Sequence, residues 1–128
     1  MSQTTTLILL PQTTYINPGN NSSYTVTGNN QPGASYIIAP RSLQTVNINL
    51  TNCTGNITIE ASLATTPVST DWFNVYELEA NANATANSAP QIASNASVYT
   101  NINGNFVYMR AKVVDFAGGV VNFVKLSY

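Results

Sequence analysis

The stretch from Gly104 to Tyr128 constrains the fold most strongly, because much of it alternates apolar and polar residues in the two-residue period of a β-strand. It indicates two strands, Phe106–Phe116 and Val120–Tyr128, joined through Ala117-Gly118-Gly119. Glycine reaches positive φ without steric cost, so Gly-Gly between such runs is typical of a hairpin turn. An antiparallel sheet with a core face and a hydrated face follows. The expected core side chains of the first strand are Val107, Met109, Ala111 and Val113, and the expected hydrated ones are Phe106, Tyr108, Arg110 and Lys112.

A second hairpin is predicted from Leu43–Leu50 and Ile57–Leu63, because both runs alternate and a turn-rich segment separates them. The inward side chains expected in this hairpin are Val46, Ile48, Leu50, Ile57, Ile59, Ala61 and Leu63. Further strands are expected at Thr4–Leu10, Tyr24–Thr27, Ser35–Ala39, Asp71–Glu79 and Ala96–Ile102.

This spacing of short strands predicts an all-β fold, an antiparallel β-sandwich of the jelly-roll or Greek-key type with roughly 8–9 strands. A chain of 128 residues is one domain, here residues 1–128. Within it we expect residues 1–20 to act as an N-terminal arm and residues 80–94 to form an exposed loop. The apolar run Leu7–Leu10 either completes the domain's own sheet or docks elsewhere.

Charged residues make up only 7% of the chain, against about 25% in a typical soluble protein. Neutral polar side chains hydrate such a surface, and little charge repulsion keeps neighbouring copies apart. The composition therefore favours close packing against a partner protein or against copies of the same chain. Arg41, Arg110, Lys112 and Lys125 are too scattered for a nucleic-acid site, which needs clustered cations, so we expect no nucleic-acid partner.

Cysteine and histidine usage limits the chemistry further. Cys53 is the only cysteine, so we expect no internal disulfide, no cysteine-based zinc site and an unreactive thiol. Histidine, the commonest general base, is absent, and no Asp-rich loop suits calcium, so we expect no cofactor and no metal. No apolar run approaches the roughly 18 residues of a membrane span, and the N-terminus lacks signal-peptide features. These features predict no membrane partner and a protein that is made in a cytoplasm.

The carboxylates offer one candidate catalytic pair and one candidate ion-pair cluster. Glu77 and Glu79 share a strand face, as a glycosidase pair could, but that pattern is also typical of the solvent face of a half-buried strand. We favour the second interpretation. Glu60, Arg110 and Lys112 have outward parity, so they form a cross-strand cluster if their strands are neighbours. The sequence therefore predicts a domain that is not an enzyme.

Aromatic residues are candidates for three roles: core packing, a protein interface or a sugar-stacking platform. Core packing is favoured, and the other two roles stay open. The aromatic residues considered are Trp72, Phe73, Tyr76, Tyr99, Tyr108, Phe116 and Tyr128. Of these, Trp72, Phe73 and Tyr76 are candidate partner contacts.

Three segments together resemble a known class of proteins. They are Gly55-Asn-Ile-Thr-Ile-Glu-Ala-Ser-Leu63, Asp71-Trp-Phe-Asn-Val75, and Gly104-Asn-Phe-Val-Tyr-Met-Arg-Ala-Lys-Val113 with Gly118-Gly119 following. In this order they resemble small β-sandwich virion structural proteins of tailed bacteriophages, notably cyanophages. The end of the chain is also similar to the last strands of discoidin-like jelly rolls. The resemblance covers roughly residues 55–128 and describes a scaffold without an active site.

The resemblance implies a virion component, and among these a capsid decoration (cement) protein that binds the major capsid protein lattice and stabilises the shell. Such proteins are made in the host cytoplasm and add to preformed capsids, commonly as homotrimers. On this basis we expect lattice contacts at Leu7, Ile8, Leu9 and Leu10, and a projection at Ala80–Pro90. A phage neck, tail or head-fibre component and a carbohydrate-binding β-sandwich module are the alternatives.

Overall fold

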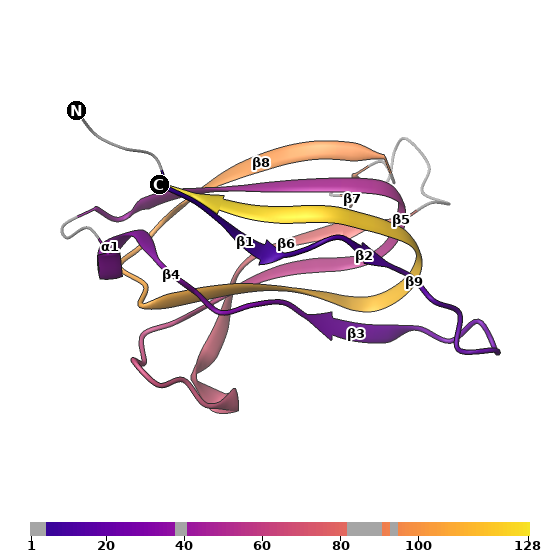
Figure 1. The fold of residues 1–128 in the computed structure, drawn as a ribbon, viewed down its shortest axis with the longest axis horizontal. Coiled ribbons are helices and arrows are strands. Elements are labelled where there is room, and N and C mark those ends of the chain that lie inside the picture. Colours follow the sequence, from indigo (N-terminus) through magenta and orange to yellow (C-terminus); the bar gives the residue numbers. More distant parts are fainter. Residues whose placement is uncertain (1–4, 38–40, 82–90, 93–94) are drawn as a thin grey trace.

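Figure 1 shows the fold in a computed structural model, which describes residues 5–37, 41–81, 91–92 and 95–128. Within these residues the fold is all-β, as predicted, with nine strands in one hydrogen-bonded sheet and only two single helical turns. The strands are β1 (Thr6–Leu10), β2 (Thr13–Thr14), β3 (Tyr24–Thr27), β4 (Gln31–Pro32), β5 (Leu43–Ser62), β6 (Trp72–Ala80), β7 (Gln91–Ile92), β8 (Ala96–Asn103) and β9 (Tyr108–Ser127), and the helical turns are α1 (Ala34–Ile37) and the 3₁₀ turn η1 (Ser69–Asp71).

Two long strands, β5 and β9, organise the sheet. Each is 20 residues long, and they pair antiparallel along nearly their whole length, from Thr45 opposite Ser127 to Ser62 opposite Tyr108. The two predicted hairpins are therefore wrong, because each predicted turn is a bend within one continuous strand. Each bend contains residues with positive φ. The bends of β5 and β9 lie against each other, so the two strands fold over together as one ribbon. The positive-φ residues of the bends are Asn52 (φ 48), Gly55 (φ 158), Asp115 (φ 54) and Gly119 (φ 76).

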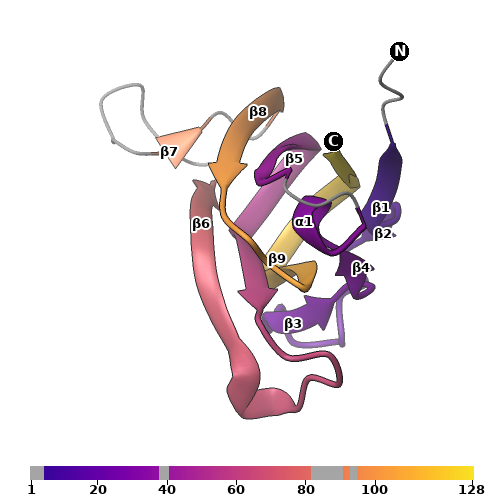
Figure 2. The ribbon, with the colours of Figure 1, turned by 90° about the vertical axis from the view of Figure 1, so that its left-hand side faces the viewer.

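The folded ribbon gives the sheet two layers that face each other (Figure 2). In the first layer the order across the strands is β8, residues 43–51 of β5, residues 120–127 of β9, and β1. In the second layer it is β6, residues 54–62 of β5, residues 108–118 of β9, and β3. The layers of the predicted sandwich are thus joined through β5 and β9 into a single curled sheet.

The bends also reverse which side chains point inward. In β5 the buried apolar side chains have even numbers before the bend and odd numbers after it, because the bend shifts the register between Thr51 and Asn56. Both inward sets were predicted, and they are confirmed except for Leu63, which is 65% exposed because β5 ends one residue before it. Buried β5 residues with this pattern are Val46, Ile48 and Leu50, then Ile57, Ile59 and Ala61.

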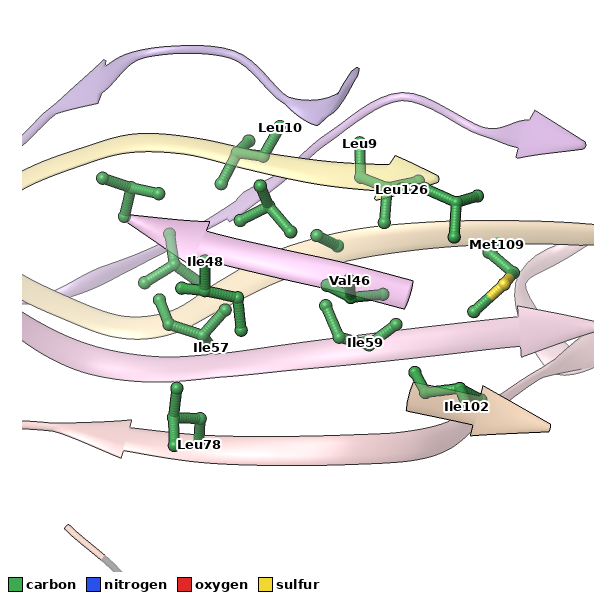
Figure 3. Packing of buried hydrophobic residues seen from close by; sticks show 14 of the residues in the cluster. Leu9, Leu10, Val46, Ile48, Ile57, Ile59, Leu78, Ile102, Met109 and Leu126 are labelled. Atoms are coloured by element: carbon green, nitrogen blue, oxygen red, sulfur yellow. The ribbon is translucent and has the colours of Figure 1, made fainter. Parts of the chain in front are cut away.

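The core lies between the two layers and draws on both (Figure 3). Val46 and Ile48 of the first layer face the same cluster as Ile57 and Ile59 of the second, and Met109 joins from β9. Burying each such aliphatic side chain contributes about 1.5–3 kcal/mol. The folded ribbon is therefore held by apolar contacts between its own two halves as well as by hydrogen bonds along its length.

The N-terminal residues close one side of the fold. The strand predicted at Thr4–Leu10 is present as β1, paired with β9, although Thr4 lies outside the described residues. Beyond β1, the Asn29 N–H donates to Leu9 O at 2.7 Å and Gln31 Nε2 donates to Ile8 O at 3.0 Å. The chain approaches so closely here that a Cβ on Gly28 would lie 2.0 Å from Leu9 O. The segment from β3 to β4 therefore links the edges of the two layers.

The strand predicted at Ser35–Ala39 is wrong, because α1 occupies this position and residues 38–40 lie outside the described residues. The Gly33 N–H donates to Val107 O and the Ala34 N–H donates to the Gln44 side chain, so side-chain and loop contacts override the apolar pattern. Most of the predicted loop at 80–94 lies outside the described residues; β7 falls within it and pairs parallel with the end of β6. In the described part of the chain, no helix has the length and apolarity to cross a membrane.

Candidate binding faces

A charged cluster lies on the outer face of the second layer. Glu60 of β5 accepts a hydrogen bond from Arg110 Nε at 2.8 Å through Oε1, and its Oε2 lies 3.2 Å from Lys112 Nζ. The Glu60 side chain is 7% exposed, whereas those of Arg110 and Lys112 are 20% and 27% exposed. The cross-strand cluster predicted from parity is confirmed, because β5 and β9 are neighbours in this layer.

Trp72 completes the charged cluster, which we define as Glu60, Arg110, Lys112 and Trp72. The Arg110 guanidinium lies 4.1 Å from the centroid of the Trp72 ring. Such stacking is favourable because the guanidinium cation meets the negative face of the ring. Both oxygens of the Glu60 carboxylate are engaged by cations, so this geometry positions the carboxylate as a structural anchor between β5 and β9.

The candidate hydrolytic pair lies on the same layer but is open to solvent. Glu77 and Glu79 follow each other on the outer face of β6, opposite Thr58 and Asn56 of β5, and both are exposed. A glycosidase pair instead flanks a bound sugar from two sides. The structure therefore brings these two residues together only as successive side chains of one strand.

The outer face of the first layer is an array of amide and hydroxyl side chains, which we call the amide face. Its side chains bond to one another across strands. Thr45 Oγ1 donates to Asn101 Oδ1 at 2.7 Å, and Asn122 Nδ2 donates to Asn49 Oδ1 at 2.8 Å. Lys125 is the one charged residue in the strand segments of this layer, and its Nζ lies 4.2 Å from the centroid of the Phe123 ring. Other residues of the amide face are Thr6, Ile8, Asn47, Thr51, Ser97, Tyr99 and Ser127.

One end of the amide face is hollowed. The hollow has a volume of about 390 Å³ and combines one cation with apolar and hydroxyl groups. Its lining residues are Arg41, Leu43, Thr45, Ser127 and Tyr128. Burial raises the pKa of the Tyr128 phenol above 10.0, and its hydroxyl donates to Pro32 O at 2.9 Å.

The candidate partner contacts do not form one surface. Leu9 and Leu10 are 0% and 1% exposed in the domain's own core, and Leu7 packs against that core. Ile8 alone of this run points to the amide face, opposite Lys125, with 36% of its surface exposed. Trp72, Phe73 and Tyr76 lie on β6 in the other layer.

The aromatic residues also divide between roles. Phe116 and Tyr128 are buried, Tyr76 packs against the core, and Tyr99 is 72% exposed on the amide face. The predictions missed an aromatic cluster in which Tyr15 and Tyr24 stack at 5.4 Å and both meet the Phe116 ring edge to face. They also missed the exposed Tyr36, whose ring lies 5.6 Å from that of Tyr108. Tyr15 was missed because turn residues surround it in the sequence, which gave no sign of a packed ring. Tyr36 was missed because it was assigned to the predicted strand Ser35–Ala39, where the structure has α1.

Two buried polar side chains stabilise the fold rather than form a site. Gln44 is fully buried, and its amide accepts from the Ala34 N–H and donates to the carbonyls of Ser42, Ile102 and Gly104. Cys53 is fully buried as a free thiol, and burial raises its pKa from 9.0 to about 11. A thiol with this pKa stays protonated at neutral pH.

No protein-family model matches the chain, and neither a curated protein nor a solved structure is significantly similar to it.

Proposed function

We propose that this chain is a non-enzymatic virion structural protein, a capsid decoration (cement) protein that adheres to the major capsid protein lattice through its amide face. The fold is compatible with this role at the level of architecture. The long antiparallel ribbon is folded over on itself with further strands added on both sides, an arrangement similar to that of a jelly roll. Viral capsid and lectin domains both use jelly rolls, so the likeness supports the proposal at the level of fold.

The observation that carries the proposal is the low charge of the amide face, whose strand segments carry Lys125 as their one charged residue. Burying a charged group against a partner has a large desolvation cost, whereas burying polar groups that already have hydrogen-bond partners costs little. Amide-face side chains already have hydrogen-bond partners on the same face: Thr45 is bonded to Asn101, and Asn122 to Asn49. Tyr99 adds a large exposed ring, of the kind enriched in the centres of protein interfaces.

The opposite face is less suited to the same task. The second layer carries the charged cluster together with the exposed carboxylates of Glu77 and Glu79. Docking this face would desolvate several charges. The proposal therefore places the amide face against the shell and the charged cluster toward solvent, on a protein that is made in the host cytoplasm.

The test uses phage particles that lack this protein, to which purified protein is added back. We expect saturable binding and a gain in the heat resistance of the particles. Ile8→Glu adds a charge to the amide face beside Lys125, with which it can pair, so the fold should be kept while binding is weakened. Thr25→Glu, an exposed position of β3 in the second layer, is the matched control and should bind like the unmodified chain. Unchanged heat resistance after add-back would exclude the cement role.

A neck, tail or head-fibre component is the nearest alternative within the same class. Quantitative mass spectrometry of purified particles separates the two. A cement protein is present in proportion to the major capsid protein, whereas a neck or fibre component is present in proportion to proteins of the tail.

A carbohydrate-binding module is the second candidate, and it is favoured by Tyr36 and Tyr108. Tyr36 is 49% exposed and its ring lies close to that of Tyr108, beside the charged cluster. Exposed aromatic faces next to charged hydrogen-bonding groups suit a sugar ring. A glycan array followed by titration tests this function, with Tyr36→Ala and Trp72→Ala expected to lose binding. Failure of every glycan to bind removes the candidate.

A further inference from the structure

Among the residues that the structure describes, one edge strand lacks the usual protection against pairing with another chain. An edge strand presents unpaired N–H and C=O groups, so natural edges are shortened, bulged, covered, or given charged residues or proline. Among the described residues, β8 pairs with β5 alone. It is eight residues long, contains neither proline nor a charged residue, and pairs with β5 without any register shift. Figure 2 shows it at the outer margin of the sheet.

The other edges have the protection that β8 lacks. On β1, Asn29 and Gln31 bond to the outer carbonyls of Leu9 and Ile8. Opposite β5, β6 has a register shift, it carries Glu77 and Glu79, and β7 pairs with its last residues. β3 and β4 are only four and two residues long. Of the described edges, β8 is therefore the one best suited to pair with another strand.

The hydrogen bonds show which groups of β8 are directed outward. The carbonyls of Val98 and Ile102 point toward β5, because they accept from the side chains of Asn47 and Gln44. Successive residues of an antiparallel strand turn their N–H and C=O groups alternately to the two sides. The backbone groups of the odd-numbered residues therefore point to the open edge. These residues are Ser97, Tyr99, Asn101 and Asn103.

We infer that β8 pairs antiparallel with β8 of a second copy of this chain across a two-fold axis. Near the two-fold axis each side chain lies close to its own equivalent, so a charge there would be repelled by its copy, and β8 has no charged residue. In the two-fold arrangement the open β8 edge of each copy is paired with that of the other. No open β8 edge is then left for a third copy, so the assembly ends at a dimer. The inference is independent of the capsid proposal, because it concerns only how two copies meet.

One register pairs all four outward-directed residues. In it Tyr99 faces Asn101 of the second copy, and Ser97 faces Asn103. Thr100 then faces its own copy in a non-hydrogen-bonded pair, where Cα atoms are about 4.5 Å apart. Disulfides span Cα separations of about 4.4–6.8 Å, so two cysteines at this position could bridge. The native Cys53 is fully buried and does not compete.

The test combines sedimentation analysis with cysteine cross-linking on the full chain. We expect a dimer that dissociates on dilution and an association constant that falls roughly tenfold or more in Asn101→Lys, since an edge lysine opposes pairing. Asn74→Lys, an exposed position on the other edge strand, is the matched control and should leave the dimer unchanged. Circular dichroism checks that both variants fold.

Cross-linking tests the register. Thr100→Cys should form a disulfide-linked dimer under mild oxidation, whereas Asn74→Cys should not. A monomer at every concentration, or an oligomer that Asn101→Lys leaves intact, would overturn the inference. A trimer in which Thr100→Cys forms no cross-link would also overturn the inference, because the contact between copies would then lie outside β8. A heterologous extended peptide that binds this edge while the chain stays monomeric would also contradict it.

Discussion

Arg110 and Glu60 lie opposite each other on β9 and β5, with Nε and Oε1 2.8 Å apart. This pair ties the two long strands together on the outer face of the second layer, while the core fixes them from the inner face. Since Lys112 approaches the other carboxylate oxygen, the single negative charge of Glu60 is shared between two cations.

Replacing Glu60 by Gln should destabilise the fold. The amide cannot compensate the charges of Arg110 and Lys112, which are only partly exposed to water, so we expect a loss of about 1–3 kcal/mol in the free energy of unfolding. Urea denaturation measures it. Glu77→Gln on the exposed face of β6 should change stability by no more than about 0.5 kcal/mol. Equal effects of the two substitutions would contradict the anchoring role.

Gln44→Leu should be more damaging than its conservative shape suggests. The leucine leaves the buried Ala34 N–H and the Ile102 carbonyl without the partners that Gln44 provides. Each unsatisfied buried group costs about 1–3 kcal/mol, so the expected loss is at least about 2 kcal/mol. Gln12→Leu, at an exposed position, is the control. A neutral result in urea denaturation would show that this polar contact is dispensable.

Gly119→Ala should disrupt the fold of the ribbon, and Gly118→Ala should not. Gly119 has φ +76, and a Cβ there would lie 2.0 Å from Asn52 O on the neighbouring strand. At Gly118 the nearest atom would be Thr54 Oγ1, at 4.0 Å. Backbone strain at such positions costs about 1–3 kcal/mol before steric overlap is added. Thermal unfolding of the two variants compares them directly, and similar midpoints would argue against a tight bend at this site.

Stability should fall at alkaline pH through Cys53. Its pKa is about 11 in the folded protein and 9.0 for an unperturbed thiol, so the folded state holds the proton more tightly. The stabilisation is fully present below pH 9.0 and is lost as pH rises toward about 11, by about 2–3 kcal/mol at most. The difference in unfolding free energy between the unmodified chain and Cys53→Ala should narrow over this range. A constant difference would mean that the thiol does not titrate as described.

Alternation predicted the inward side chains of β5 on both sides of its bend and those of β9 from Met109 to Val113, because burial on a pleated strand depends on local pattern. Ile57 and Val113 are examples that face the core as expected. Parity also placed Glu60, Arg110 and Lys112 on one outer face. The inward faces needed only the two-residue period of a strand. The charged cluster also needed one strand pairing, that of β5 with β9, which the structure contains.

The fold of the ribbon could not be read locally. Gly118-Gly119 has the composition of a hairpin turn, yet each strand's partner is the other long strand rather than its own second half. Whether a strand half pairs with its own second half or with the other long strand depends on contacts between residues far apart in sequence. The bends also use Asn52 and Asp115 at positive φ, for which the sequence offers only a weak signal. The buried role of Gln44 was missed for the same reason.

Electron cryomicroscopy of intact phage particles that carry this protein tests the central claim most directly. The account predicts density for the domain at equivalent positions over the capsid lattice, with the first layer and Tyr99 turned toward the shell and Glu60, Arg110 and Lys112 turned toward solvent. Density confined to the neck, tail or fibres, or a domain docked on the lattice through its charged cluster, would contradict it.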